Sequence, residues 1–321
     1  MQFRSYSDLA RAVSSNLSRV PSDVDLIVGI PRSGLIPASV VSLGLNLPMT
    51  DIEGLLAGRL AVTRLTRRIG CGALAVRDCS HALVLDDSIY TGSTLAVIKE
   101  RIRAAQLPLR VTYAAVYATP ESAAAVDLFF EVCPRPRVFE WNYLHHHVLA
   151  TALIALDGVL GVDSQLFNAA SSTERASYLA GLQPRVRPTA RILGFVTDCV
   201  SAGQADLQAW LQRHGITFQH LILRDRVPRR SSDSLAHKAR AYRRETRATL
   251  FLDGSSGDGQ RIASRSGKPV IDVRERVLYE PHPLAWCNLK KRGRRLWTRA
   301  LAQLAESNPA AAAGASARRP S

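Results

Sequence analysis

Short apolar runs rich in β-branched residues alternate along this chain with longer segments of mixed polarity. The first two runs, 24–30 and 82–86, each lead through a turn into a segment with helical spacing, PASVVSLGLNL and LAVIKERIRAAQ. A third apolar run covers 111–118. Strands that alternate with helices favour a parallel sheet with helices on both faces. The first part of the chain is therefore predicted to be an α/β domain.

A second series of the same kind begins near residue 151. Between its strands, the amphipathic segment ADLQAWLQRHG is predicted to be a helix that ends at Gly215. The expected strands are 151–158, 191–198, 249–254 and 269–273. The fold class that follows is α/β, with two domains that each contain a sheet.

Changes in composition set the expected domain boundaries. Proline, arginine and aromatic residues accumulate around 136–150, which we interpret as a connector whose Trp141 packs at the domain interface. The last segment, 286–321, is basic and ends in a low-complexity stretch that is predicted to be partly disordered. The two domains are therefore expected to cover 1–135 and 151–285.

The composition indicates the cellular compartment in which the protein is expected to work. The chain has 321 residues, of which 46% are hydrophobic and 21% charged, and its apolar runs are shorter than the roughly 20 residues of a membrane-spanning helix. The N-terminus lacks the apolar core of a secretory signal, and the five cysteines show no CxxC spacing. These features indicate a cytoplasmic protein with reduced thiols, without a confident metal site.

The charge is the unusual property of this composition. The formal net charge is +15, and Lys290–Ser321 alone holds eight Lys/Arg and one Glu, a local net of +7. A basic chain favours an anionic partner, which could be nucleic acid, a phosphorylated substrate or an anionic membrane surface. An Arg- and Ala-rich composition that merely solvates the surface is the alternative.

Two aspartates stand side by side after the second apolar run. Asp86 and Asp87 raise one another's pKa, so their placement destabilises the fold unless cations or hydroxyl groups lie nearby. Four residues later comes a turn of small and hydroxylated residues, Thr91–Thr94. Such a turn before a helix offers amides and hydroxyls to a phosphate monoester. A sugar phosphate would explain both features, whereas a capping turn without a ligand is the alternative.

This stretch resembles the type I phosphoribosyltransferases. Their fingerprint is an apolar strand, two acidic residues, three variable positions and Thr-Gly-x-Thr-Leu, and the chain matches it throughout. The resemblance implies that phosphoribosyl pyrophosphate binds here, with its ribose hydroxyls on Asp86 and Asp87. Its 5-phosphate would lie on Thr91, Gly92, Ser93, Thr94 and Leu95.

Two further segments fit the same resemblance. A loop after the first strand would hold the pyrophosphate, and its Arg32 would add a charge-assisted contact during catalysis. That loop consists of Gly29, Ile30, Pro31, Arg32, Ser33 and Gly34. A basic segment with Arg64, Arg67 and Arg68 matches the mobile loop that closes over the reaction centre in this family, although a solvated loop is as good an interpretation of any single arginine. The implied enzyme is a Mg²⁺-dependent pentosyltransferase in which the acceptor is the nucleophile.

The second domain resembles the haloacid-dehalogenase-like domains that are fused to some phosphoribosyltransferases. Their first motif is Asp-x-Asp-Gly, and here Ala155 replaces the nucleophilic Asp while Asp157 keeps the second position. Thr197, Lys238 and Asp253 match the later motif positions. Because alanine cannot form an aspartyl-phosphate, we expect a catalytically degenerate domain.

The fused layout resembles proteins encoded with bacterial surface-polysaccharide genes, which favours transfer of ribose 5-phosphate to a glycan hydroxyl. The alternatives are a nucleobase acceptor such as orotate, or a non-catalytic regulator that binds phosphoribosyl pyrophosphate. We also expect a homodimer, and a basic tail that contacts an anionic membrane face. The acceptor itself is not encoded in the motifs, because acceptor pockets in this family come from variable segments.

Overall fold

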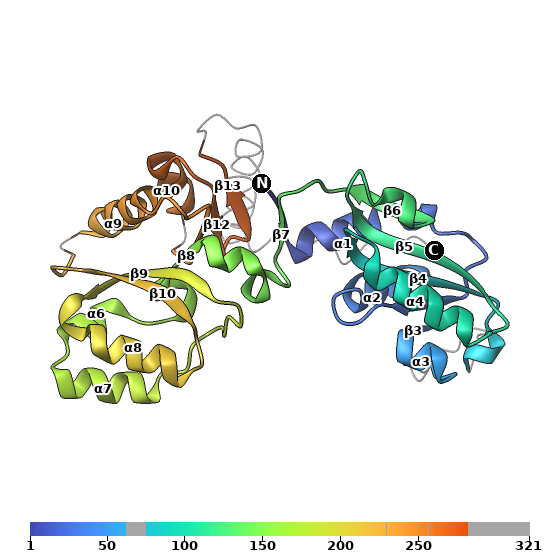
Figure 1. The fold of residues 1–321 in the computed structure, drawn as a ribbon, viewed down its shortest axis with the longest axis horizontal. Helices are drawn as coiled ribbons and strands as arrows, with labels where there is room; N and C mark the ends of the chain where they lie inside the picture. The colour runs from blue at the N-terminus through green and yellow to red at the C-terminus, as the bar shows by residue number, and fades with distance from the viewer. Residues whose placement is uncertain (62–74, 229, 256, 282–321) are drawn as a thin grey trace, which may run out of the picture. The chain divides into compact units, whose positions relative to one another are not determined.

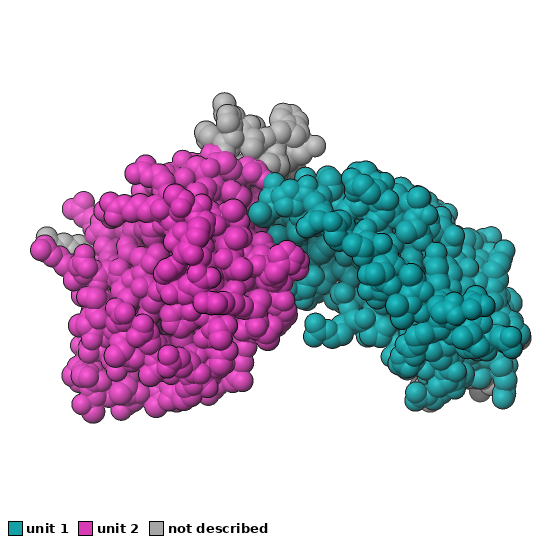
Figure 2. Space-filling view, in the orientation of Figure 1, with its two compact units in different colours: residues 1–143 teal, residues 144–321 magenta. Residues whose placement is uncertain are grey.

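The computed structural model describes residues 1–61, 75–228, 230–255 and 257–281. It divides into two compact units, Met1–Tyr143 and Leu144–Ser321, which we call unit 1 and unit 2 (Figures 1 and 2). Within the described ranges, no helix is long and apolar enough to cross a membrane. The predicted mobile loop and the basic tail lie outside the described residues.

Unit 1 is built on a five-stranded parallel sheet with the order β3-β2-β4-β5-β6. Its strands are β2 (Leu26–Gly29), β3 (Met49–Asp51), β4 (His81–Ile89), β5 (Arg110–Ala118) and β6 (Leu128–Val132). Its helices are α1 (Tyr6–Ser14), α2 (Leu35–Leu45), α3 (Ile52–Leu56) and α4 (Ser93–Ala104). A separate parallel pair is formed by β1 (Gln2–Arg4) and β7 (Arg137–Phe139).

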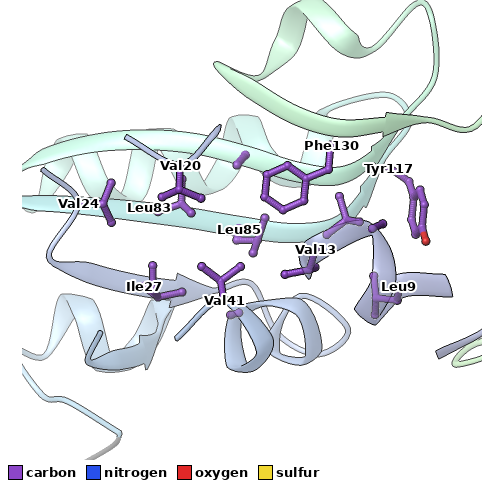
Figure 3. Close-up of a cluster of buried hydrophobic side chains, with 14 of the residues drawn as sticks. Leu9, Val13, Val20, Val24, Ile27, Val41, Leu83, Leu85, Tyr117 and Phe130 are labelled. Carbon is purple, nitrogen blue, oxygen red and sulfur yellow. The ribbon is translucent and has the colours of Figure 1, made fainter. Parts of the chain in front are cut away.

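The sheet of unit 1 is buried on both faces, which explains why its strands read as continuous apolar runs. Helices α1 and α2 cover one face, where Leu9 and Val41 pack against Leu83 and Leu85 (Figure 3). Helices α3 and α4 cover the other face. Each fully buried aliphatic side chain of this kind stabilises the fold by about 1.5–3 kcal/mol. The strand ends, and the loops that follow them, are therefore held on a rigid base.

Unit 2 contains a six-stranded sheet with the order β10-β9-β8-β11-β12-β13, in which only β13 runs antiparallel to its neighbour. Its strands are β8 (Ala152–Ala155), β9 (Ile192–Val200), β10 (Phe218–Arg224), β11 (Leu250–Asp253), β12 (Val270–Asp272) and β13 (Val277–Tyr279). Its helices are α5 (Leu156–Leu160), α6 (Ser164–Ala169), α7 (Ser172–Gly181), α8 (Gln204–Arg213), α9 (Ser231–Arg244) and α10 (Gly259–Ser266). Figure 1 shows α9 and α10 on one side of this sheet and α6, α7 and α8 on the other.

The structure differs from the sequence-based expectation at two boundaries. Residues 136–150 are not a simple connector, because β7 pairs with β1 and the boundary between the units falls at Tyr143. The apolar side chains of β7 are buried, with Phe139 stacked on Trp141, so this segment belongs to the core of unit 1. The strand expected at 151–158 ends at Ala155, and the chain turns directly into α5.

Two glycines of unit 2 meet backbone to backbone where α5 passes the end of β11. A Cβ atom added at Gly254 would lie 2.1 Å from the carbonyl oxygen of Gly158 and 2.3 Å from its carbonyl carbon. Real Cβ atoms do not approach backbone atoms so closely, so neither segment can accept a side chain there without moving. The contact fixes the position of α5 relative to the sheet.

We predict that Gly254→Ala lowers the free energy of unfolding of unit 2 by about 1–3 kcal/mol, as expected for overpacking at a rigid contact. The matched control is Gly181→Ala, where an added Cβ meets nothing within 4 Å. The control should leave the urea midpoint unchanged or raise it slightly. Equal midpoints for the two variants would contradict the tight contact.

Candidate active site

The two adjacent aspartates lie within β4, close to its carboxyl end, and point to opposite faces of the sheet. Successive side chains of a strand alternate in direction, yet the two carboxyl groups stay close enough for Asp87 to raise the pKa of Asp86 through its charge and a side-chain hydrogen bond. Asp87 is buried, with 4% of its surface exposed, and faces the side covered by α1 and α2. Asp86 is half-buried. The two carboxylates therefore have different surroundings.

Asp87 is held by two donors from distant parts of unit 1. The Ser33 hydroxyl donates to its Oδ1 atom at 2.6 Å, and the Trp141 Nε1 atom donates to its Oδ2 atom at 2.8 Å. Trp141 is itself positioned by stacking on Phe139, with ring centroids 4.8 Å apart. Both oxygens of Asp87 thus accept hydrogen bonds from the protein. Its predicted contact with ribose hydroxyls stays a prediction.

The charged form of Asp86 is poorly stabilised in the folded protein. Its Oδ1 atom accepts a hydrogen bond from the backbone amide of Asp87 at 2.8 Å. Burial, and secondarily the neighbouring charge of Asp87, raise the pKa of Asp86 to about 8. A carboxylate with so little compensation would be stabilised by hydroxyl donors or by a cation. Asp86 is therefore better placed than Asp87 to receive a polar ligand.

The predicted pyrophosphate loop, 29–34, lies directly against the end of β4. The Ile30 amide donates to the Leu85 carbonyl at 3.0 Å. A Cβ atom added at Gly34 would lie 2.6 Å from the Ile30 carbonyl oxygen and 3.0 Å from the Cα atom of Asp86. Glycine is needed at this position because the two backbones touch. The structure thus brings loop 29–34 and the aspartate pair together, as the sequence predicted.

The tip of this loop is open to solvent. Pro31 and Arg32 are both exposed, and the peptide bond between them is cis. Arg32 forms no ion pair with any described residue, so its guanidinium is available for an anionic ligand. Ser33 is committed to Asp87 instead. The loop therefore combines an anchored base with a free cationic tip.

The hydroxyl-rich turn after β4 forms the start of α4. Gly92 has φ of +75°, a conformation that favours glycine. The Ser93 amide donates to the Thr91 hydroxyl at 3.4 Å, the Thr91 and Ser93 hydroxyls lie 3.0 Å apart, and Thr94 is exposed. Leu95 is buried and anchors the helix to the core. Exposed hydroxyls and amides at a helix N-terminus suit a phosphate group.

The predicted residues of unit 2 also converge at strand ends. Thr197 donates from Oγ1 to Asp157 Oδ1 at 2.9 Å, and the Asp198 amide donates to Asp157 Oδ2 at 3.1 Å. Lys238 donates to Asp253 Oδ1 at 2.8 Å in a buried ion pair. Burial, opposed by these hydrogen bonds, raises the pKa of Asp157 to about 6. These groups bind one another, but the Oδ2 atom of Asp253 is buried without a hydrogen-bond partner among the described residues.

Two residues near these sites were not singled out correctly from the sequence. Trp141 was expected at a domain interface, but it lies within unit 1 and donates to Asp87 across 54 residues of sequence. Asp198 was not predicted at all, although it accepts a hydrogen bond from Arg224 at 3.0 Å beside Asp157. The Thr-Asp pair at the end of an apolar strand was a usable signal for Asp198. Trp141 offered no comparable signal.

Comparison with known proteins identifies the family. The model of the phosphoribosyl transferase domain matches residues 4–146. The xanthine-guanine phosphoribosyltransferase of Idiomarina loihiensis is 30% identical over 129 residues, which cover 40% of this chain and 76% of the relative. The chain belongs to the phosphoribosyltransferase family. The matched region ends close to the end of unit 1 at Tyr143.

Solved phosphoribosyltransferases also match. The xanthine-guanine-hypoxanthine phosphoribosyltransferase of Helicobacter pylori covers 44% of this chain and 92% of its own, at 13% identity and a TM-score of 0.33. A purine phosphoribosyltransferase from Pyrococcus horikoshii covers 44% and 93%, at 18% identity and a TM-score of 0.32.

The pKa of Asp86 predicts a pH-dependent stability. Its folded value of about 8 lies above the ordinary 3.8, so the folded state binds the proton more tightly. The free energy of unfolding should therefore fall as pH rises from about 4 to about 8. Asp86→Asn should remove this loss and raise stability at pH 8.5 by a few kcal/mol (one pKa unit is about 1.4 kcal/mol), with little change at pH 4.

Urea unfolding at the two pH values tests this prediction. Glu100→Gln serves as the control, because it removes an exposed carboxylate of α4 that is paired with Arg103. The control should not gain stability at pH 8.5. An Asp86→Asn variant that is less stable than the wild type at pH 8.5 would show that its carboxylate is compensated in the folded state.

Proposed function

We propose that this phosphoribosyltransferase transfers the ribose 5-phosphate group of phosphoribosyl pyrophosphate to a nucleobase, with an oxopurine as the best candidate. The observation that carries the proposal is the meeting of loop 29–34 with the Asp86–Asp87 pair on neighbouring strands of one parallel sheet, where the second strand leads into the turn at 91–95. The identity to a xanthine-guanine phosphoribosyltransferase supports the acceptor class.

Each part of the donor has a matching group in unit 1. The 5-phosphate suits the amides and hydroxyls of the turn Thr91–Leu95 at the start of α4. The pyrophosphate suits the amides of loop 29–34 and the free guanidinium of Arg32. The ribose hydroxyls suit the uncompensated carboxylate of Asp86, which accepts hydrogen bonds that lower the free energy of its charged form. The three subsites surround one reaction centre.

The chemistry that follows is displacement at the anomeric carbon of the ribose. A ring nitrogen of the base forms a bond to that carbon as the bond to the pyrophosphate oxygen breaks, and the electron pair leaves with the pyrophosphate. The base loses its nitrogen-bound proton in the same reaction. Arg32 and the loop amides stabilise the charge that builds on the leaving group. Holding both substrates in place supplies much of the remaining acceleration.

The residues of unit 1 fit a magnesium ion that arrives with the donor. No group of three or more His, Cys, Asp or Glu side chains among the described residues is arranged to hold a metal by itself. Asp86 nevertheless offers an under-compensated carboxylate, a type of ligand that Mg²⁺ accepts together with phosphate oxygens and water. Bound there, the ion would neutralise charge on the pyrophosphate. Asp86 is the residue we expect beside it.

The glycan acceptor that the fused layout implied finds no support in the comparisons, in which the relative at 30% identity is named for xanthine and guanine. The nucleobase alternative fits better. The basic tail, 286–321, lies outside the described residues, so its contact with a membrane stays a prediction, as does the homodimer. The alternative hypothesis is a regulator that binds phosphoribosyl pyrophosphate without turnover. Pyrophosphate release distinguishes this hypothesis from that of an enzyme.

We predict pyrophosphate release from phosphoribosyl pyrophosphate and Mg²⁺ when guanine, xanthine or hypoxanthine is added, with orotate as the comparison base. Asp86→Asn should lower kcat/KM about 10–100-fold, because a hydrogen bond to a charged group contributes about 1.5–3 kcal/mol. Glu100→Gln, on the exposed side of α4, should retain wild-type activity. Steady-state kinetics with each base measure the effect.

The outcome also separates the alternatives. Binding of the donor in calorimetry, without pyrophosphate release for any base, would favour the regulator. Unchanged donor binding in Asp86→Asn would remove the site assignment itself.

We further propose that unit 2 is a haloacid-dehalogenase-like domain without phosphatase activity. The convergence of Asp157 with Thr197, and of Lys238 with Asp253, supports the likeness. Ala155, fully buried at the end of β8, stands where the nucleophilic aspartate would be. No covalent phosphoryl intermediate can form on a methyl group.

We predict that the full chain does not hydrolyse p-nitrophenyl phosphate above the rate in buffer, with or without Mg²⁺. Asp157→Asn, which removes the carboxylate that would act as acid and base, should give the same baseline. Colorimetric release of nitrophenol measures both proteins. Turnover by the wild type that disappears in Asp157→Asn, but persists in Asp86→Asn, would show that unit 2 is an active phosphatase.

A further inference from the structure

A cavity of about 750 Å³ lies in unit 2 between the edge strand β10 and helix α9. Such a volume is typical of sites for small molecules. One wall is formed by Ile222 and the residues that follow it at the end of β10. The other wall is a single face of α9, with His237, Arg240 and Arg244 at helical spacing. The buried Lys238 lies on a neighbouring face of the same helix.

The cavity is lined by more positive charge than the structure neutralises. Arg226, Arg240 and Arg244 line it, are exposed, and form no ion pair with any described residue. Two acidic residues also line it: Glu245 is paired with Arg247 at 3.2 Å, and Asp225 is exposed and forms no ion pair with any described residue. Exposed arginines that gather around a hollow, without carboxylate partners, indicate an anionic ligand.

The fourth arginine of the cavity, Arg224, is fixed in place. Its Nη1 atom donates to Asp198 at 3.0 Å and to the Asp233 carbonyl at 2.9 Å. This arginine therefore links the cavity wall to the cluster around Asp157 without being free itself. It gives the floor of the cavity a defined geometry, whereas the three unpaired arginines remain able to adjust to a ligand.

The remaining surface favours a ligand with an uncharged part. Ile222 and Ala241 contribute apolar surface, and the imidazole of His237 lines the cavity with a buried Nε2 atom that has no hydrogen-bond partner among the described residues. Burial lowers the pKa of His237, while the backbone groups of Thr197 and Ile222 beside its ring raise it.

We propose that this cavity binds a small polyphosphorylated metabolite, a molecule with two or more phosphoryl groups joined to an uncharged ring or sugar. The phosphoryl groups lie along Arg226, Arg240 and Arg244. The uncharged part lies against Ile222 and His237. Arg240 and Arg244 are one helical turn apart, and together with Arg226 they offer more hydrogen-bond donors than a single phosphate group uses. The site is independent of the donor site of unit 1.

Calorimetry with the full chain at 150 mM salt tests the proposal, with ATP, AMP and inorganic tripolyphosphate as probes. We expect ATP to bind more tightly than both AMP and tripolyphosphate, because it alone fills the arginines and the apolar wall. Arg240→Gln/Arg244→Gln should weaken ATP binding at least tenfold. The matched control, Arg243→Gln/Arg265→Gln, removes two exposed charges outside the cavity and should stay within twofold.

Three results would overturn the proposal. The first is that no probe binds, and the second is that ATP binding is weakened equally in the two double variants. The third is that single-stranded oligonucleotides displace ATP and bind more tightly as their length increases. The last would mark a nucleic-acid surface. Arg32→Gln, in unit 1, should leave ATP affinity unchanged, which separates this site from the donor site. Thermal melting of each variant confirms that its fold is retained.

Discussion

The hydrogen bonds to the Asp87 carboxylate hold together three segments that are distant in sequence. Ser33 comes from the loop after β2, Asp87 from the end of β4, and Trp141 from the segment after β7. Because the carboxylate is buried, loss of either donor would leave an oxygen without a partner, which costs about 1–3 kcal/mol. The Asp87 side chain thus adds to the Ile30 amide bond and the close contact at Gly34 in holding loop 29–34 over the sheet. The proposed pyrophosphate subsite is built on that arrangement.

Fixing Asp87 in this way also determines what Asp86 can do. With one carboxylate locked toward the core, its neighbour on the strand must face the opposite side, where α4 begins. Asp86 is then half-buried next to a negative charge. Its raised pKa shows that ionisation of Asp86 costs free energy in the folded state. Structural ion pairs would relieve such strain at once. The strain that remains is typical of a site that is completed by its ligand.

Much of this arrangement follows from local sequence, and the exceptions share a physical cause. Apolar runs with β-branched residues predicted β2, β5, β9 and β11, and the order of strand, turn and helix brought the two donor loops to one edge of a parallel sheet. Short strands such as β3 and β13 have too few residues for a pattern. Trp141 was assigned to an interface because its bond to Asp87 depends on the pairing of β7 with β1, and no local pattern encodes that pairing.

The two units use the same edge of a parallel sheet in opposite ways. In unit 1 the Asp86 carboxylate accepts a hydrogen bond from the Asp87 amide but keeps a raised pKa, which supports the ligand proposed there. In unit 2 Asp157 accepts bonds from Thr197 and the Asp198 amide, and Lys238 is neutralised by Asp253. These bonds occupy most of the groups that could contact a phosphate, although the Asp253 Oδ2 atom has no partner among the described residues. Arg240 and Arg244 of α9 line the cavity without an ion pair to any described residue, which is why we look for an anionic ligand of this unit there.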